Sequence, residues 1–271
     1  MVGVKKHNWL SFTLIAMTLL FFYLPIIFLM VFSFNDARSL TVWQGSSLRW
    51  YQALLSDRDM MEAIRTTVIV AVLATIISTV IGTLTAIGLS KARRVVKDII
   101  LTVNDLPILN PEIVTAIGMM LFFVSLHLNK GFTTMLLAHI AFCIPYVILS
   151  VLPKLRSLDP DVAEAALDLG ATPAQTLIRV IVPQIWGSII SGALIAFTMS
   201  FDDFVISYFA TGNGVKNISI MVYTMTKRVN PTINALSTIM VAVITVVLLA
   251  VNIAPLLKGR NNKVKNFEEG Y

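Results

Sequence analysis

Four acidic side chains fall inside stretches of this chain that are otherwise apolar: Asp105, Glu112, Asp202 and Asp203. An ionised carboxylate inside a bilayer is costly, and it usually faces a cavity or an opposite charge. Adjacent residues point about 100° apart on a helix, so we expect one of Asp202 and Asp203 to face such a cavity. The alternative for this pair is hydrogen bonding between helices. The acids indicate a path for a cation, although Asp105 lies nearer the cytoplasmic boundary.

Glu112 stands in a sequence that is typical of a helix start. Asn110 fits an N-cap, Pro111 fits the first helical turn, and Glu112 places a carboxylate at the positive end of the helix dipole. A helix that starts in the middle of an apolar stretch predicts a broken membrane helix, which is tolerated where the backbone meets protein or water. The alternative is that Glu112 only complements the helix end.

Aromatic side chains accompany the acids. Trp43, Trp50 and Tyr51 lie in the first loop, where residues 48–63 read as a short amphipathic helix that ends before the second apolar stretch. Tyr208 and Phe209 follow Asp202 and Asp203 toward the outer face. Aromatic rings with carboxylates hold alkyl ammonium groups by cation–π contact and ion pairing, whereas a single Trp or Tyr often only anchors a protein at the membrane surface. The combination favours a cationic substrate.

The composition places these residues in a membrane protein. Hydrophobic residues make up 56% of the 271 residues and charged residues 13%, about half the charged share of a soluble domain, and the mean hydropathy is +0.81. We expect an all-α fold that forms one membrane domain over residues 1–271 with six transmembrane helices. The predicted spans are Trp9–Phe34, Thr66–Leu89, Ile99–Leu126, Phe132–Leu152, Ile185–Phe209 and Ala235–Leu257.

Basic residues orient these spans. Clusters of Lys and Arg lie before the first span, after the second, around the loop that follows the fourth, and after the last. These regions alternate with regions that are poorer in positive charge, so the positive-inside rule places both termini in the cytoplasm. The formal charge of +6 follows from this topology. The sequence has no patch of interleaved basic and aromatic residues that would suggest nucleic-acid binding.

The sequence shows no pattern for bond chemistry. Cys143 is the single cysteine, and with His139 one turn away it makes only two of the ligands that a metal site needs. There is no P-loop, no zinc-protease motif and no nucleophile elbow. We expect no cofactor and no catalysis, so energy for uphill transport must come from a partner or an ion gradient.

The loop at about residues 153–184 carries two helix signatures. Asp159 fits an N-cap followed by Pro160, and Gly170 fits the left-handed position after a helix. Thr172, Pro173 and Gln175 then fit the start of a second helix, which Pro183 is expected to end. We expect this loop to lie outside the bilayer.

Within it, the residues Glu164-Ala165-Ala166-x3-Gly170-x9-Val180-x-Val182-Pro183 resemble the EAA loop of permease subunits of ATP-binding-cassette (ABC) importers. The family pattern has Ile and Leu where Val180 and Val182 stand. The resemblance implies that Glu164, Ala165, Ala166 and Gly170 dock in a cleft of a cytoplasmic ATPase and transmit its closure. The alternative, an amphipathic helix lying on the membrane, usually carries a bulky apolar face and flanking basic residues.

Almost the whole chain is similar to the second permease subunit of spermidine/putrescine importers. The matching stretches are Arg49–Tyr51, Asn110–Val114, Ser200–Val205, Met221–Tyr223 and Asn234–Leu236. The resemblance implies that Trp50, Glu112, Asp202 and Asp203 serve polyamine passage. One departure is Glu112, where the family pattern has an aspartate, and the extra methylene leaves the preferred polyamine open.

The resemblance implies a type I ABC importer (MetI-like) permease in a bacterial inner membrane. Its expected partners are a second permease subunit, two copies of an ATPase and an extracytoplasmic binding protein, with a polyamine as substrate. Within the family, the substrate could be another cation or a small organic solute. Outside it, an ion-coupled carrier is a further alternative, although such carriers have internal repeats that this sequence lacks. The acids within the spans argue against a non-transporting scaffold.

Overall fold

The computed structural model describes residues 8–39, 42–212, 214–226, 230–246 and 249. The chain divides into two compact units, one formed by residues 1–58 with 224–271 and the other by Asp59–Tyr223. The described secondary structure is helical apart from one isolated bridge between Asn35 and Ser46. The apolar stretches form helices because a helix satisfies its own backbone hydrogen bonds where lipid offers none.

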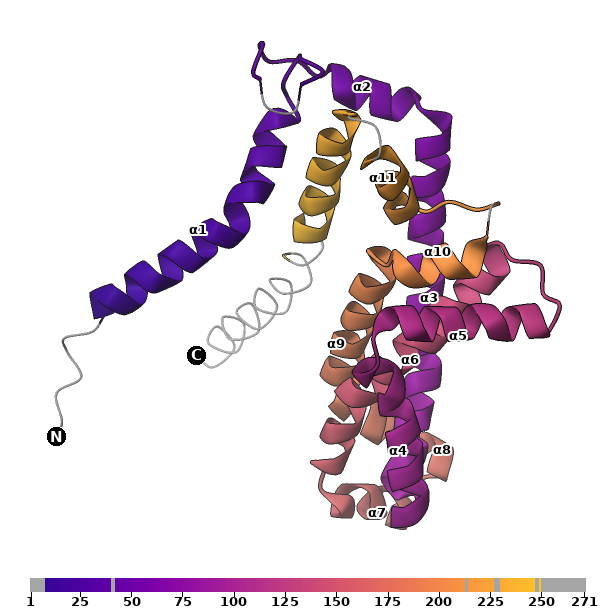
Figure 1. The fold of residues 1–271 in the computed structure, drawn as a ribbon. Coiled ribbons are helices and arrows are strands. Elements are labelled where there is room, and N and C mark those ends of the chain that lie inside the picture. Colours follow the sequence, from indigo (N-terminus) through magenta and orange to yellow (C-terminus); the bar gives the residue numbers. More distant parts are fainter. Residues whose placement is uncertain (1–7, 40–41, 213, 227–229, 247–248, 250–271) are drawn as a thin grey trace. The chain divides into compact units, whose positions relative to one another are not determined.

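The first unit contains two labelled helices. Helix α1 spans Asn8–Phe32 and helix α2 spans Arg49–Ser56 (Figure 1). The described side chains of α1 are almost all exposed and mostly apolar, as expected of a helix that faces lipid or another chain. The predicted loop helix over residues 48–63 is wrong in its end, because α2 stops at Ser56 and the next helix begins at Arg58.

The second unit contains the remaining labelled elements, of which α3 begins and α11 ends just beyond its limits. They are α3 (Arg58–Lys91), α4 (Arg94–Leu109), α5 (Glu112–Ser125), α6 (Phe132–Arg156), α7 (Pro160–Asp168), α8 (Pro173–Thr176), the π-helical segment η1 (Leu177–Ile181), α9 (Val182–Phe201), α10 (Val205–Thr211) and α11 (Ile218–Thr226).

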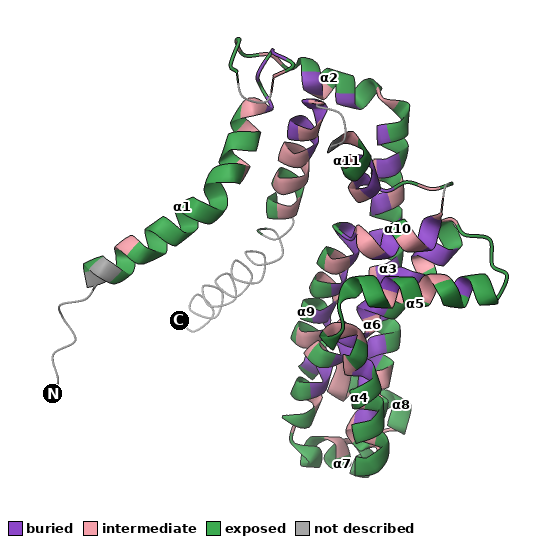
Figure 2. Ribbon diagram, viewed as in Figure 1, coloured by how far each residue is buried: buried purple, intermediate pink, exposed green. Residues whose placement is uncertain are grey.

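Helix α6 lies at the centre of this unit. Its buried side chains include Phe142, Val147 and Val151, and they share one apolar core with residues of α3, α5, α9 and α10. Figure 2 shows buried residues along α6 and α10, whereas the outer faces of α4 and α9 are exposed. Small residues allow the helices to approach closely: an added Cβ at Gly82 of α3 would lie 2.7 Å from Cβ of Val147. Close packing of this kind is the main source of helix association in lipid.

Four described helices are long and apolar enough to cross a membrane, and the bent pair α4–α5 adds a fifth. The four are Ser11–Phe32, Arg58–Lys91, Phe132–Arg156 and Pro173–Phe201. The sixth predicted span, Ala235–Leu257, starts within a described apolar helix over Thr232–Val246, and its end lies outside the described residues.

The third predicted span is broken, as the sequence indicated. Helices α4 and α5 meet at an angle of 109°. The expected N-cap at Asn110 is wrong: Asn110 ends α4, and Pro111 takes the N-cap position of α5 without a side-chain capping bond. Proline fits there because its missing N–H is not needed at a helix start and because it disfavours a helical residue before it.

The fifth predicted span is wrong as a continuous helix over 185–209. Helix α9 ends at Phe201, and the short helix α10 begins at Val205. The Asp203 carboxylate accepts hydrogen bonds from the backbone N–H groups of Ile206 and Ser207, at 3.2 and 2.7 Å. Side-chain capping of a new helix start competes with continuation of the old helix, so the chain breaks here.

The two helix signatures of the 153–184 loop are confirmed. The Asp159 side chain accepts a hydrogen bond from the N–H of Asp161, and Gly170 has φ of 84° after α7. Thr172 and Gln175 form a reciprocal capping box at α8. The expected end at Pro183 is wrong, because α8 continues through η1 into α9. The π-helical turn places Pro183 in the first turn of α9, where a missing N–H is tolerated.

The close contact at Gly82 predicts a difference between two glycines of the same helix. Gly82→Ala should destabilise the protein by about 1–3 kcal/mol, because the new methyl group overlaps Val147. Gly88→Ala is the matched control, since no described atom lies within 4 Å of its added Cβ. The thermal midpoint of the detergent-solubilised protein measures both changes. Equal midpoints for the two variants would contradict the packing of α3 on α6.

Candidate functional site

The two helix breaks bring three acids together. Helix α5 starts at Glu112 and packs against α10, which follows the second break (Figure 1). Glu112 lies within electrostatic interaction range of both Asp202 and Asp203. Residues that are 90 positions apart in the sequence, as Glu112 and Asp202 are, thus share one site. We call Glu112, Asp202 and Asp203 the acid cluster.

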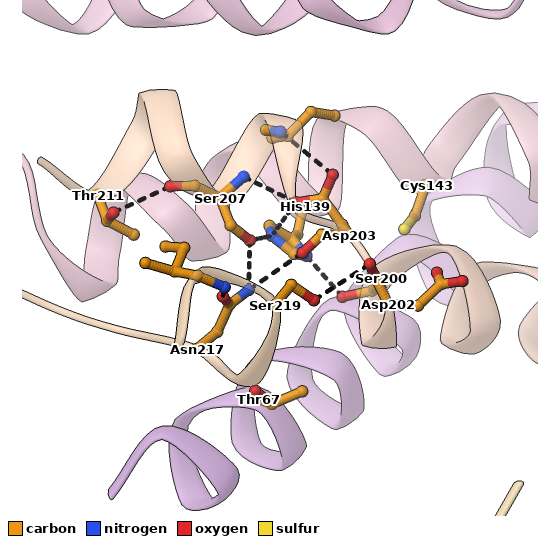
Figure 3. Close-up of polar contacts among 12 residues, drawn as sticks. Thr67, His139, Cys143, Ser200, Asp202, Asp203, Ser207, Thr211, Asn217 and Ser219 are labelled. Atoms are coloured by element: carbon orange, nitrogen blue, oxygen red, sulfur yellow. Dashed lines mark hydrogen bonds and ion pairs between the residues drawn. The ribbon is translucent and has the colours of Figure 1, made fainter. Parts of the chain in front are cut away.

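Asp203 is the buried member of the acid cluster. Its side chain has no exposed surface, and its Oδ2 atom lies 3.3 Å from Nε2 of His139, whose side chain is 1% exposed. The same carboxylate caps α10 through the N–H groups of Ile206 and Ser207. Figure 3 shows Asp203 between His139 and Ser207. A buried carboxylate needs such donors, because the surrounding helices offer no water to solvate it.

A polar network extends from this pair. His139 Nδ1 lies 2.7 Å from Oγ of Ser200, and Nε2 lies 2.9 Å from Oγ of Ser207. The Asn217 side-chain amide donates to Oγ of Ser207 at 2.7 Å and to the backbone carbonyl of Asp203 at 3.2 Å. Thr67 of α3 accepts a hydrogen bond from the N–H of Ile218 at 2.8 Å. The network joins α3, α6, α9 and α10 to the segment that leads into α11.

Asp202 and Glu112 are the exposed members of the acid cluster. Asp202 forms the C-cap of α9, and its backbone carbonyl accepts a hydrogen bond from Oγ of Ser219 at 3.2 Å. Its carboxylate points away from the His139 network in Figure 3. The break therefore turns two adjacent acids in opposite directions, one into the protein and one outward.

An aromatic group continues from the break. Phe204 stacks obliquely on Tyr223 with ring centroids 4.7 Å apart, and Tyr208 lies 5.5 Å from Phe204 and 6.1 Å from Tyr223. Tyr208 is 48% exposed and Tyr223 is 43% exposed. The group begins two residues after Asp202 in the sequence, and exposed aromatic faces are suited to hold an organic cation.

Two further residues that the sequence singled out, Asp105 and Trp50, make other contacts. Asp105 is in α4, and its carboxylate accepts a hydrogen bond from the side-chain amide of Asn104. Trp50 belongs to the first unit, where it is buried and donates its indole N–H to the carbonyl of Asn35 at 2.7 Å. The guanidinium of Arg49 lies 4.6 Å from the centre of the Trp50 ring. The indole thus anchors the first loop.

Most of the EAA-like residues are exposed. Glu164 and Ala165 lie open on α7, Ala166 is half-buried, and no described side chain of α7 is fully buried. A cavity of about 860 Å³ lies behind this helix, between the ends of α3 and α6 and the start of α8. Helix α7 is therefore presented as a surface that another protein can contact.

The sequence does not point to the uncharged members of the network. His139 stands out only beside Cys143, and as single polar residues no signal is carried by Thr67, Ser200, Ser207 and Asn217. A histidine within an apolar stretch is itself a signal, because an unsatisfied imidazole is costly there. Its partners come from positions 61 and 68 residues away, which no local pattern reveals.

A family profile and several known permeases match the sequence of this chain. The family profile described as "Binding-protein-dependent transport system inner membrane component" matches residues 78–257. Putrescine transport system permease protein PotI of Escherichia coli is 35% identical over 252 residues, which cover 90% of this chain and 89% of that protein. Spermidine/putrescine transport system permease protein PotC is 35% identical in Escherichia coli, covering 85% and 88%, and 34% identical in Haemophilus influenzae, covering 89% and 93%.

Solved structures agree on the fold. A chain of a bacterial ABC transporter that imports the acidic polysaccharide alginate aligns with a TM-score of 0.71 at 15% identity, covering 94% of this chain and 99% of that one. The same kind of transporter in complex with its alginate pentasaccharide-bound periplasmic protein aligns with a TM-score of 0.64 at 16% identity, covering 92% and 96%. At these identities the likeness shows the fold alone.

Proposed function

Since the chain belongs to the family of binding-protein-dependent transport system inner membrane components, we propose that it is the permease subunit of an ATP-driven importer of polyamines. As a member of this family, the chain is a multi-pass inner-membrane transport component that works with a binding protein. It carries no ATPase activity of its own. One observation carries the choice of substrate: the two helix breaks bring Glu112 and Asp202 together as exposed acids of one cluster.

The charge of the site supports a cation. Polyamines are flexible chains with several protonated amino groups, and each ammonium can pair with a carboxylate or rest on an aromatic face. Glu112 and Asp202 supply the exposed carboxylates, and Tyr208 with its ring neighbours supplies the aromatic faces. Asp203 adds negative charge behind them. Trp50, in the outer loop, would contribute to the path of the polyamine. The relatives named for putrescine and spermidine support the same choice.

The fold by itself does not choose the substrate. The structural relatives belong to an importer of an acidic polysaccharide, so one architecture carries substrates of opposite charge. This makes the acids, and not the helix arrangement, the basis for the proposal. An importer of another organic cation would use the same acid cluster.

Helix α7 is suited to couple this path to a partner. We expect Glu164, Ala165 and Ala166 to dock in a cleft of a cytoplasmic ATPase, with the left-handed Gly170 setting the turn behind the helix. The complex would contain a second permease subunit, two ATPase copies and an extracytoplasmic binding protein. Closure of the ATPase dimer would move α7, and through α8 and η1 this motion reaches α9 as one continuous helical rod.

This arrangement predicts the sidedness of the loops. In a Cys143→Ala background, a cysteine at Asp168 should react with an impermeant maleimide only in inverted vesicles, because α7 lies on the cytoplasmic side. A cysteine at Asn129, in the exposed loop between α5 and α6, should react in intact cells. Labelling at position 168 from outside intact cells would contradict the proposed orientation.

The docking role of α7 predicts the effect of a charge reversal. Glu164→Lys should lower the ATPase activity that the loaded binding protein stimulates by about tenfold or more, because reversing a charge in an interface costs at least about 1.4 kcal/mol. Asp98→Lys on exposed α4 is the control with the same charge change. Complex assembly is checked by co-purification. Full stimulation in an assembled Glu164→Lys complex would remove α7 from coupling.

The substrate assignment is tested by uptake of radiolabelled spermidine and putrescine in cells that lack their own polyamine importers. Asp202→Asn and Glu112→Gln should each lower uptake by about tenfold or more, since a carboxylate near an ammonium is worth several kcal/mol in a partly dry site. Glu112→Asp should retain much of the uptake because it keeps the charge. Asp105→Asn, which changes an acid outside the cluster, is the control.

Two results would count against the assignment. Undiminished uptake in Asp202→Asn and Glu112→Gln would remove these acids from the route. A wild-type complex that moves a neutral or anionic solute but no polyamine would refute the substrate and leave the family membership in place.

A further inference from the structure

The break between α9 and α10 is held by one imidazole. His139 of α6 contacts Ser200 in the last turn of α9 through Nδ1 and Ser207 in the first turn of α10 through Nε2. The side chain therefore bridges the two helices across the break, as Figure 3 shows. Its Nε2 also lies 3.3 Å from the Asp203 carboxylate, which is itself the cap of α10.

We propose that His139 is a positioning residue, whose Nε2–H holds Asp203 at the α9–α10 break and so presents Asp202 to the substrate. The proposal rests on the importer function above and divides the adjacent acids by role. Asp202 meets the cation, whereas Asp203 holds the backbone that places Asp202.

The neighbours of the imidazole determine which ring nitrogen carries a hydrogen. A carboxylate only accepts hydrogen bonds, so the ring nitrogen that faces Asp203 must carry a hydrogen. The Ser200 hydroxyl at Nδ1 can donate or accept, so it suits both the neutral and the protonated ring. Asn217 donates to Ser207 Oγ, and the Ser207 hydroxyl lies within hydrogen-bond range of the Asp203 carboxylate, so this hydroxyl does not need Nε2 as an acceptor. The site is thus built around a donor at Nε2.

The bonds of Asp203 leave it little capacity for a substrate. Its Oδ1 accepts from the N–H of Ile206, and its Oδ2 accepts from the N–H of Ser207 and faces His139. The carboxyl of Glu112 also lies within hydrogen-bond range of the Asp203 side chain. With no exposed surface on the side chain, an ammonium could reach it only if these contacts opened. Asp202, one residue earlier, is exposed and keeps its carboxylate outside the network.

A double-mutant cycle tests whether Asp203 acts as the structural partner of His139 or as a substrate ligand. His139→Leu leaves the Asp203 charge buried without its partner, so it should lower the maximal rate of polyamine uptake by about tenfold or more. The concentration for half-maximal uptake should rise less than it does in Asp202→Asn, because the Asp202 carboxylate remains although its position is less well held. Adding Asp203→Asn removes the unpaired charge, so the double variant should recover at least about threefold over His139→Leu.

A further loss of uptake in the double variant, in place of recovery, would overturn the proposal. If Asp203 were a substrate ligand, the double variant would transport less than either single variant, and Asp203→Asn alone would raise the half-maximal concentration. Asp202→Asn gives the comparison, since loss of a true ligand should raise that concentration. His139→Gln should retain uptake within about threefold, because its amide can still donate toward Asp203; a loss as deep as that of His139→Leu would also count against the proposal.

Thr134→Val is the matched control. Thr134 donates to the carbonyl of Ala210 at 2.8 Å, which is another buried hydrogen bond from α6 to α10 but has no carboxylate. Asp203→Asn should not rescue this variant. Rescue of Thr134→Val to the same extent would show that Asp203→Asn stabilises the bundle in a general way and would refute the specific pairing.

The amount of assembled complex in the membrane provides a second reading. If His139→Leu fails to accumulate, Asp203→Asn should restore accumulation, and continued absence of the double variant would contradict the proposal. This reading needs no substrate, so it stays valid if the wild-type complex moves a different solute. Failure of polyamine uptake by the wild type would refute the proposed function, while an additive cycle would refute the role of His139.

Discussion

The structure depends on one constraint: a helix that breaks inside a bilayer must find partners for its freed backbone groups within the protein. The chain breaks twice in its second unit, before Glu112 and after Phe201. At the second break, the Asp203 carboxylate satisfies two backbone N–H groups of α10, and His139 satisfies the carboxylate. Thr67 and Asn217 bind the backbone of the next segment. A charged residue thereby becomes part of the scaffold.

The hydrogen bonds of Asp203 at the second break also determine where the exposed acids lie. Once Asp203 is held inward, the turn of the chain directs Asp202 outward, and the packing of α5 on α10 brings Glu112 to the same site. Helix α9, which ends at this site, is continuous through η1 and α8 with the loop that carries α7. One helical rod therefore runs from the turn behind α7, the surface proposed to meet the ATPase, to the break that positions the acids, which is the connection that alternating access requires.

Much of this could be predicted from local sequence, because caps and proline positions act within a few residues. Asp159, Gly170 and the Thr172–Gln175 box lie where their patterns indicated. The break before Glu112 was predictable for the same reason. The break after Phe201 was not predicted, since the apolar residues on either side of Asp202 and Asp203 read as one helix, and the Asp203 cap depends on support by His139 from a distant helix. Pro183 misled because a π-helical turn upstream changed its position within the helix. The partners of His139 come from distant helices, so only the fold brings them together.

The central claim is that the two adjacent acids have different roles, and a structure of the assembled complex in a lipid bilayer with bound polyamine tests it most directly. The account predicts an ammonium nitrogen within about 4 Å of the Asp202 carboxylate, with Glu112 also facing the ligand. The contact between His139 Nε2 and Asp203 should remain closed. An ammonium bound to Asp203 with the imidazole displaced, while Asp202 faces away from the ligand, would contradict the account.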